Sequence, residues 1–341
     1  MNNRELIELL NLIKEVNTVD DKKLKTDMIH HISAYGAYLY YTGLISNNDF
    51  TNAINCIKDD LEDKLYYEER NKYIDILLKN NNLLNSFFKK YLHIYWKYSF
   101  NEATDYINVD IENEFNNFLK YVNCYKLYVL IKEKKQISNK SNILSHSICL
   151  DNREDSYIIL RNKNVFHEYL DLSHEMAHVL ENNLLSKYRR CFDSPYNVEI
   201  LSITFNRMFI EYLFQNNKIT KAEYNILLNN FELNYYSFTR LSLFISDSIN
   251  FRDYSINDYD ISVFCEDEVI SRSLTDYNYA IGRIASLKLF DEWKKDDYLF
   301  IKNIPNLVDD IYHLSIKDIV NIFGNSEEIL DNELSKNLVK K

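Results

Sequence analysis

Hydrophobic residues recur at steps of three and four along most of the 341-residue chain, which is the spacing of one face of an α-helix. The first such face runs through Leu6, Leu9, Leu10 and Ile13. Only 4 Gly and 2 Pro are present, a scarcity that helices tolerate but folds with many tight turns do not. A short apolar run near residues 156–161 predicts a strand. We therefore expect a mainly α fold with one small β region.

The segment that follows this strand predicts an amphipathic helix with two distinct stripes. It contains no Pro or Gly between residues 157 and 194, and Asn164 suits the N-cap position. The apolar stripe consists of Phe166, Leu170, Ala177, Leu180 and Leu184. The polar stripe beside it consists of Asp171, His174, His178 and Glu181. A buried helix face therefore adjoins a face that carries two histidines.

Residues 174–178 of this helix read His-Glu-Met-Ala-His. Because His174 and His178 are four residues apart, their imidazoles project from the same face and can bind one zinc ion. Glu175 lies where a general base could take a proton from a zinc-bound water. The alternative is a surface helix with two solvated histidines, since so short a pattern also arises by chance. The amphipathic pattern around the motif favours a zinc-binding helix.

A hydrolytic zinc site needs a third protein ligand and an open fourth position. Ser194 suits an N-cap and Pro195 the first helical position, which places Glu199 about one turn into an apolar helix that ends near residue 214. An unpaired carboxylate among apolar neighbours is costly to bury, and a metal would remove that cost. We therefore expect Glu199 to be the third ligand.

Other assignments of the third ligand remain open. Glu199 would also suit an exposed position in the first turn, where the helix dipole favours an acidic side chain. Asp193 and Glu181 are the other acidic candidates. Glu181 lies on the zinc helix itself, one turn beyond His178, so direct ligation would strain tetrahedral geometry. We expect Glu181 to lie behind the ligands or in solvent.

Three separated segments resemble the thimet oligopeptidase/oligoendopeptidase F family of zinc metallopeptidases. Residues 157–161 (Tyr-Ile-Ile-Leu-Arg) stand where that family has a strand before its His-Glu-x-Gly-His motif. Residues 199–202 (Glu-Ile-Leu-Ser) resemble its Glu-Ile-x-Ser segment, and residues 277–282 (Tyr-Asn-Tyr-Ala-Ile-Gly) resemble its Tyr-x-Tyr-Ala-x-Gly segment. The resemblance covers roughly residues 150–295. It implies a short, divergent member with a helical zincin-type (gluzincin) fold and a small β region beside the zinc helix.

The resemblance also implies a role for each matching residue. The ligands of one Zn²⁺ would be His174, His178 and Glu199. Glu175 would activate water, and Tyr279 would donate its hydroxyl to the oxyanion of the tetrahedral intermediate. Tyr277 would contact the substrate. The strand that contains Ile159 could pair with an extended peptide along its edge, as zincins hold their substrates.

The chain departs from the family pattern at several positions. Ala177 replaces the usual glycine before the second zinc histidine. A histidine and a tyrosine that normally precede the tyrosine motif are missing, and Arg272 stands about where that tyrosine would be. Arg272 could stabilise an oxyanion or bind a substrate carboxylate, or it could instead pair with Glu268. The chain is also about half as long as typical family members.

Composition narrows the set of partners and compartments. A net charge of −11 argues against a nucleic-acid partner, and it is compatible with a peptide substrate. The 5 cysteines are odd in number and widely spaced, which favours free thiols in a reducing compartment. The N-terminus lacks an apolar signal core, and the uncharged segment 28–48 fits a buried aromatic helix better than a membrane span. We expect a cytoplasmic protein without a membrane partner, and no feature indicates its oligomeric state.

The apolar pattern is interrupted by charged and polar residues between residues 132 and 155. We therefore expect an N-terminal helical region at 1–135 and a catalytic zinc-peptidase region at 150–341. The predicted function is a zinc-dependent endopeptidase that hydrolyses short peptides. Two alternatives stay open: a dedicated processing protease for one leader peptide or protein, and a non-catalytic protein that binds zinc or peptide.

Overall fold

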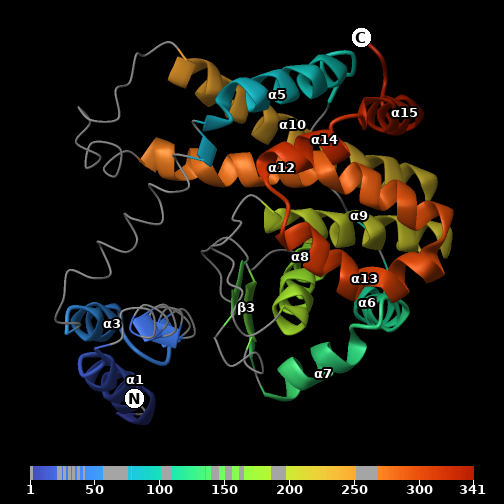
Figure 1. Cartoon of the computed structure of the whole chain (residues 1–341). Helices are drawn as coiled ribbons and strands as arrows, with labels where there is room; N and C mark the ends of the chain where they lie inside the picture. Colours follow the sequence, from blue (N-terminus) through green and yellow to red (C-terminus); the bar gives the residue numbers. More distant parts are fainter. Residues whose placement is uncertain are drawn as a thin grey trace. The chain divides into compact units, whose positions relative to one another are not determined.

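The computed structural model describes most of the chain. The described residues are 3–20, 25, 28–29, 32, 35–36, 39–40, 43–56, 76–77, 79–100, 107, 109–134, 136–139, 146–149, 156–160, 165–185, 197–250 and 268–341. Within these ranges, the side chains of residues 3, 54, 139, 146–149, 157, 165, 244–250 and 268–276 are not described. The predicted helical class is confirmed, because helices account for nearly all the regular structure in these ranges (Figure 1).

The chain forms two compact units, each made of two separate stretches of sequence. The first comprises residues 1–72 and 119–189, and the second comprises residues 73–118 and 190–341. The boundary at residue 118 falls inside helix α6 (Ile111–Tyr121). These units divide the chain differently from the predicted regions 1–135 and 150–341. The assignment of an N-terminal helical region and a catalytic region stays a prediction.

The first unit contains a small sheet and the helix that packs on it. The sheet has strand order β1-β3-β2, with β1 (Ile137–Asn139) parallel and β2 (His146–Cys149) antiparallel to the central β3 (Ser156–Leu160). Helix α8 (Val165–Leu184) lies against β2 and β3 (Figure 1). The strand predicted near residues 156–161 is therefore confirmed as β3, and it lies beside the helix that carries the two histidines.

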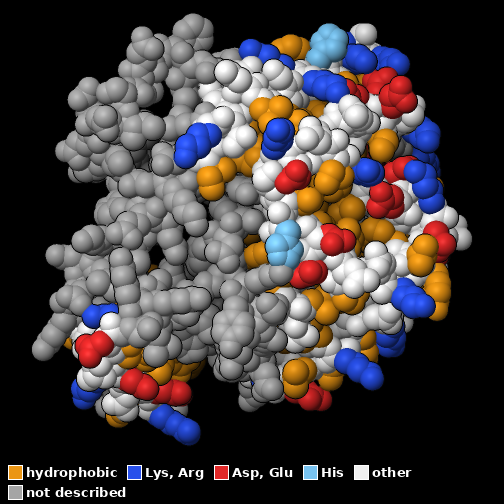
Figure 2. Space-filling view, viewed as in Figure 1, with side chains coloured by type: hydrophobic (Ala, Val, Ile, Leu, Met, Phe, Trp, Pro, Cys, Tyr) orange, Lys and Arg blue, Asp and Glu red, His pale blue; other side chains and the backbone are white. Residues whose placement is uncertain are grey.

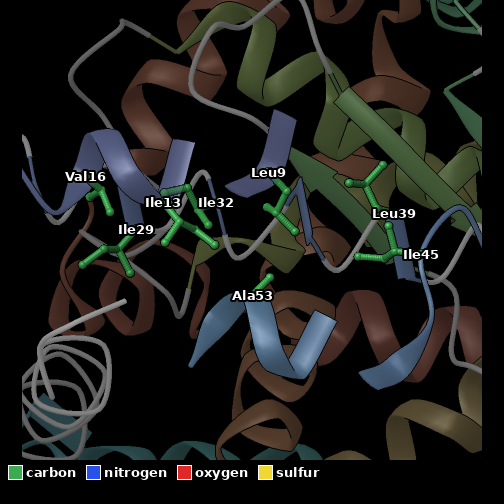
Figure 3. Close-up of a cluster of buried hydrophobic side chains, with 8 residues drawn as sticks. All are labelled: Leu9, Ile13, Val16, Ile29, Ile32, Leu39, Ile45 and Ala53. Atoms are coloured by element: carbon green, nitrogen blue, oxygen red, sulfur yellow. The ribbon is translucent and has the colours of Figure 1, made fainter. Parts of the chain in front are cut away.

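The first unit also contains a separate hydrophobic cluster near the N-terminus. Its side chains come from α1 (Asn3–Val16), from helical positions between residues 25 and 40, and from α3 (Asn47–Ile54) with the turn before it. Figure 3 shows these side chains directed toward one another: Leu9, Ile13, Val16, Ile29, Ile32, Leu39, Ile45 and Ala53. The predicted apolar face of α1 is confirmed, because Leu9 and Ile13 belong to this cluster while Leu6 and Leu10 pack against it. Helix α7 (Tyr125–Glu133) also belongs to this unit.

Long helices form the second unit. Helices α9 (Glu199–Gln215), α10 (Lys221–Asn250) and α12 (Glu268–Lys295) pack side by side, and α5 (Asn81–Tyr95) packs on α10 (Figure 1). Helices α13 (Asp297–Tyr312), α14 (Ile316–Phe323) and α15 (Glu327–Asn337) follow α12 and pack against it. Because α9 and α12 are neighbours, residues that are about 80 positions apart in the sequence meet in this unit.

Two buried arginines bind these helices to one another through carboxylates. Arg207 of α9 and Arg283 of α12 have 1% and 0% of their surface exposed. Glu333 of α15 accepts hydrogen bonds from Arg207 Nε (2.6 Å) and Arg283 Nη2 (3.0 Å). Glu232 of α10 is the second partner of Arg283, and Glu211 is the second partner of Arg207. The two buried guanidinium groups therefore share three carboxylates, with Glu333 between them, which provides the pairing that buried charge requires.

The surface of the described residues is mixed in charge. On the face that Figure 2 shows, acidic and basic side chains alternate and do not gather into one large patch of a single sign. Within the described part of the chain, no helix has both the length and the apolar character needed to cross a bilayer.

Candidate metal centre

Helix α8 places the two predicted zinc ligands side by side. Of the predicted apolar stripe, Phe166 and Ala177 are buried, whereas the leucines at 170, 180 and 184 are only partly buried. The buried side instead includes Leu172, Met176 and Val179, which have 0–4% of their surface exposed, so it differs from the predicted stripe. His174 is partly buried and His178 is 9% exposed. The Nε2 atoms of the two imidazoles lie 3.3 Å apart. One turn of helix thus directs two nitrogen donors at the same point.

The separation of the two nitrogens suits a tetrahedral metal ion. Two ligand atoms that are each about 2.0–2.1 Å from zinc, at a tetrahedral angle, lie roughly 3.3 Å apart. The Nε2 atoms of His174 and His178 already have this separation. A carboxylate oxygen of Glu199 completes the group, and the three ligand atoms all lie within 4.8 Å of one another. Two imidazoles and one carboxylate are a donor set that zinc accepts, so these residues can hold a metal ion.

Glu181 supports the second histidine and does not join the ligand group. Its Oε2 lies 3.2 Å from Nδ1 of His178, and the side chain of Glu181 is 8% exposed. When Nδ1 donates its proton to this carboxylate, Nε2 presents its lone pair to the metal position. Of the two places expected for Glu181, behind the ligands or in solvent, the structure thus shows the first.

Glu199 is the first residue of α9, which differs from the predicted position one turn into the helix. Residues 194 and 195, which were expected to start the helix, lie outside the described residues, as does the alternative ligand Asp193. An acidic residue at this position interacts favourably with the positive end of the helix dipole. The side chain is partly buried, and Ser202 Oγ lies 2.8 Å from Glu199 Oε2. Local structure therefore stabilises the ionised carboxylate that a metal ligand requires.

Helix α12 approaches α9 at Glu199 itself. A Cβ atom built on Gly282 would lie 2.8 Å from the Cβ of Glu199, and 2.9 Å from its carbonyl carbon and oxygen. Real Cβ atoms essentially never come closer than 3.0 Å to other heavy atoms. The close contact of the two helices at this point thus depends on a residue without a side chain.

The two tyrosines of the 277–282 motif have different surroundings. The ring of Tyr279 is partly buried and stacks on Phe238 of α10, with centroids 4.8 Å apart. Tyr279 lies one helical turn before Gly282, which is about 4.5 Å along the helix axis. Tyr277 is 2% exposed and its ring makes an edge contact with Phe88. Its burial in the core does not agree with the predicted substrate contact, whereas the role of Tyr279 stays a prediction.

The remaining predicted site residues fall into three cases. Glu175 lies on α8 next to His174 and is 3% exposed. Ile159 is fully buried in β3, and its strand pairs with a neighbour on each side. The prediction that a substrate pairs with the edge of this strand is therefore wrong, because β3 is central and the outer strands are β1 and β2. The side chain of Arg272 lies outside the described part.

Sequence reasoning did not identify Ser202 and Gly282 as neighbours of the third ligand. Both letters belong to the segments that carried the family resemblance. A serine three residues after a glutamate on a helix can reach that carboxylate, which is a local signal. The contact of Gly282 with Glu199 joins residues 83 positions apart, and no local pattern indicates it.

Comparisons with known proteins give little further information. No protein-family model matches the chain. No curated protein matches it in sequence. Among solved structures it is similar to the crystal structure of a "putative peptidase from Chlamydophila abortus", with a TM-score of 0.43 and 13% identity, over 93% of this chain and 63% of that chain. A likeness of this size transfers neither fold nor activity, so the function has to be inferred from the chain's own residues.

Proposed function

We propose that this chain is a zinc-dependent endopeptidase that hydrolyses short peptides. The observation that carries the proposal is the convergence of His174, His178 and Glu199, whose ligand atoms lie within 4.8 Å of one another. A general-base candidate, Glu175, is adjacent to the first ligand on the same helix. Zincin-type fold, membership of the oligopeptidase family and the identity of the metal are parts of this proposal.

The residues of the chain would divide the reaction between them. His174, His178 and Glu199 would hold a zinc ion, which would supply the Lewis acidity needed to polarise a carbonyl and lower the pKa of water. Glu175 accepts a proton from the attacking water and delivers it to the leaving amine nitrogen as the peptide C–N bond breaks. The Tyr279 hydroxyl donates a hydrogen bond to the oxygen that gains negative charge.

We infer that an extended substrate would add to an outer strand of the sheet next to α8. The three described strands have β1 and β2 as their outer members, and α8 packs against β2 as well as β3. A peptide that adds to an outer strand would be held by backbone hydrogen bonds, with little dependence on its sequence. This fits the proposed activity on mixed short peptides.

The first test is hydrolysis of a mixed peptide library by the zinc-loaded protein, with metal content measured on the same sample. Glu175→Gln should retain zinc and fold while losing about 100-fold or more in kcat, because the variant cannot accept the proton. Glu168→Gln is the matched control, since it changes a carboxylate on the same helix about 10 Å away. Full turnover by Glu175→Gln would contradict the proposed mechanism.

The same experiment separates the alternatives. Stoichiometric zinc binding without cleavage of any peptide would indicate a non-catalytic zinc or peptide-binding protein. A series of substrates of increasing length separates the two proteases: rates that fall for long chains support the oligopeptidase. One strong cleavage site in a long substrate would instead indicate a dedicated processing protease.

A further inference from the structure

The carboxylate of Glu199 is held by a buried serine on its own helix. Ser202 Oγ lies 2.8 Å from Glu199 Oε2 and 3.1 Å from the Glu199 backbone oxygen. Ser202 has no exposed surface, so protein atoms enclose its hydroxyl group. A hydroxyl that bonds one carboxylate oxygen restricts rotation of the side chain and so fixes the direction in which the carboxylate points.

The backbone of Glu199 is held by the close approach of α12. An added Cβ at Gly282 would be 2.9 Å from the carbonyl carbon and oxygen of Glu199, and backbone atoms cannot rotate away as the end of a long side chain can. Glycine in a helix interior is less favourable than alanine. Helix propensity alone would therefore favour alanine at position 282, and the contact with Glu199 is the structural reason for glycine.

The contact of Gly282 with Glu199 also sets the position of Tyr279 relative to Glu199. Tyr279 is one turn from Gly282 on α12, and its ring rests on Phe238 of α10. Any side chain at position 282 would have to separate α12 from the start of α9. That movement would shift the third metal ligand and the predicted oxyanion donor relative to each other.

We propose that Ser202 and Gly282 are positioning residues of the metal centre. Ser202 fixes the carboxylate of Glu199, and Gly282 allows α12 to fix its backbone and to hold Tyr279 at a set separation from it. The inference rests on the proposed zinc site. It predicts that substitution of either residue lowers the affinity for zinc, and that a loss of fold stability does not account for this decrease.

Zinc affinity, measured by competition with a chromogenic chelator, tests the role of Ser202. Ser202→Ala should weaken zinc binding by about 10- to 100-fold, as the loss of a partner behind a metal ligand typically does. The matched control is Thr204→Val, which removes another buried hydroxyl from α9, one that donates to the Ile200 backbone oxygen at 2.7 Å. Equal zinc affinities for Ser202→Ala and Thr204→Val would overturn the proposal.

Gly282→Ala tests whether the close contact of α12 with Glu199 supports zinc binding. It should lower both the zinc affinity and the thermal midpoint, although helix propensity alone predicts a higher midpoint. Ala280→Val is the control, because it adds bulk at a buried position on a different face of α12, and it should lower the midpoint without weakening zinc binding. Wild-type zinc affinity in Gly282→Ala would overturn this half of the proposal. If Gly282→Ala does not fold, the Ser202 comparison decides the proposal by itself.

Two ligand variants separate this inference from the zinc site itself. His174→Ala and Glu199→Ala should each abolish tight zinc binding. If they do, while Ser202→Ala and Gly282→Ala bind zinc like wild type, only the positioning roles are wrong. If His174→Ala and Glu199→Ala bind zinc normally, the proposed metal site is wrong.

Discussion

Glu333 offers a quantitative test of what holds the second unit together. Its carboxylate accepts hydrogen bonds from Arg207 and Arg283, whose side chains are 2% and 0% exposed. Glu333→Gln keeps the shape of the side chain and some of its hydrogen bonds but removes the negative charge. Both guanidinium groups would then be buried with one carboxylate fewer, which is strongly unfavourable.

The size of the effect follows from the pKa of Glu333. Burial raises this pKa, but the charges of Arg207 and Arg283 outweigh burial and lower it from 4.5 to about 2. A difference of about 2.5 units between the folded and unfolded chains corresponds to roughly 3 kcal/mol of stability at neutral pH. The loss of one partner from a buried ion pair costs about 3–5 kcal/mol, which is the same range. Glu333→Gln should therefore destabilise the fold by about 3 kcal/mol at pH 7.

The loss of stability in Glu333→Gln should become smaller as the pH falls. Because the pKa of Glu333 is lower in the folded state, its contribution is complete above pH 4.5 and decreases as the pH falls toward 2. At pH 3 it should be roughly 1–1.5 kcal/mol. The free energy of unfolding in urea, measured for both proteins from pH 7 to pH 3, checks this decrease. Glu232 and Glu211 also face these arginines and are present in both proteins. Because the charge of Glu333 contributes to the raised pKa of Glu232, the difference between the two proteins reports the whole cluster of charges.

Asp291→Asn provides a control with the same chemical change at the surface of α12. Its partner Lys295 is 70% exposed, and exposed pairs of this kind contribute less than about 1 kcal/mol. The reasoning is refuted if Glu333→Gln is as stable as Asp291→Asn at pH 7. A difference from wild type that does not shrink between pH 7 and pH 3 would also refute it.

Two further predictions concern a helix cap and a thiol. Ser315 accepts a hydrogen bond from the Asp318 backbone at 3.2 Å in a capping box at the start of α14, so Ser315→Ala should cost about 1 kcal/mol in urea unfolding. An unchanged unfolding midpoint would contradict the role of this cap. Burial raises the pKa of the Cys124 thiol to about 12, whereas Cys56 is exposed, so a thiol reagent at pH 8 should modify Cys56 and spare Cys124 in the native protein. Peptide mapping by mass spectrometry checks this order, and rapid native labelling of Cys124 would show that its site opens.

The sequence predicted those features that depend on neighbours within one or two turns of chain. The spacing of apolar residues indicated the helical class and the buried face of α1. The four-residue interval between His174 and His178 placed two imidazoles on one face of α8, and their Nε2 atoms are 3.3 Å apart. Helix geometry is local, so a pattern of a few residues suffices to predict it.

Other features required the tertiary structure because they depend on how distant segments meet. The chain between His178 and Glu199 is long enough for many arrangements, and only the fold brings the carboxylate to the imidazoles. The apolar run of β3 did not reveal that it is the central strand, since sheet order depends on partners elsewhere in the chain. The burial of Arg207 and Arg283, and the contact of Gly282 with Glu199, likewise arise between helices far apart in sequence. Sequence thus determined the local elements and the type of chemistry, while long-range packing decided which side chains share a site and which charges are enclosed.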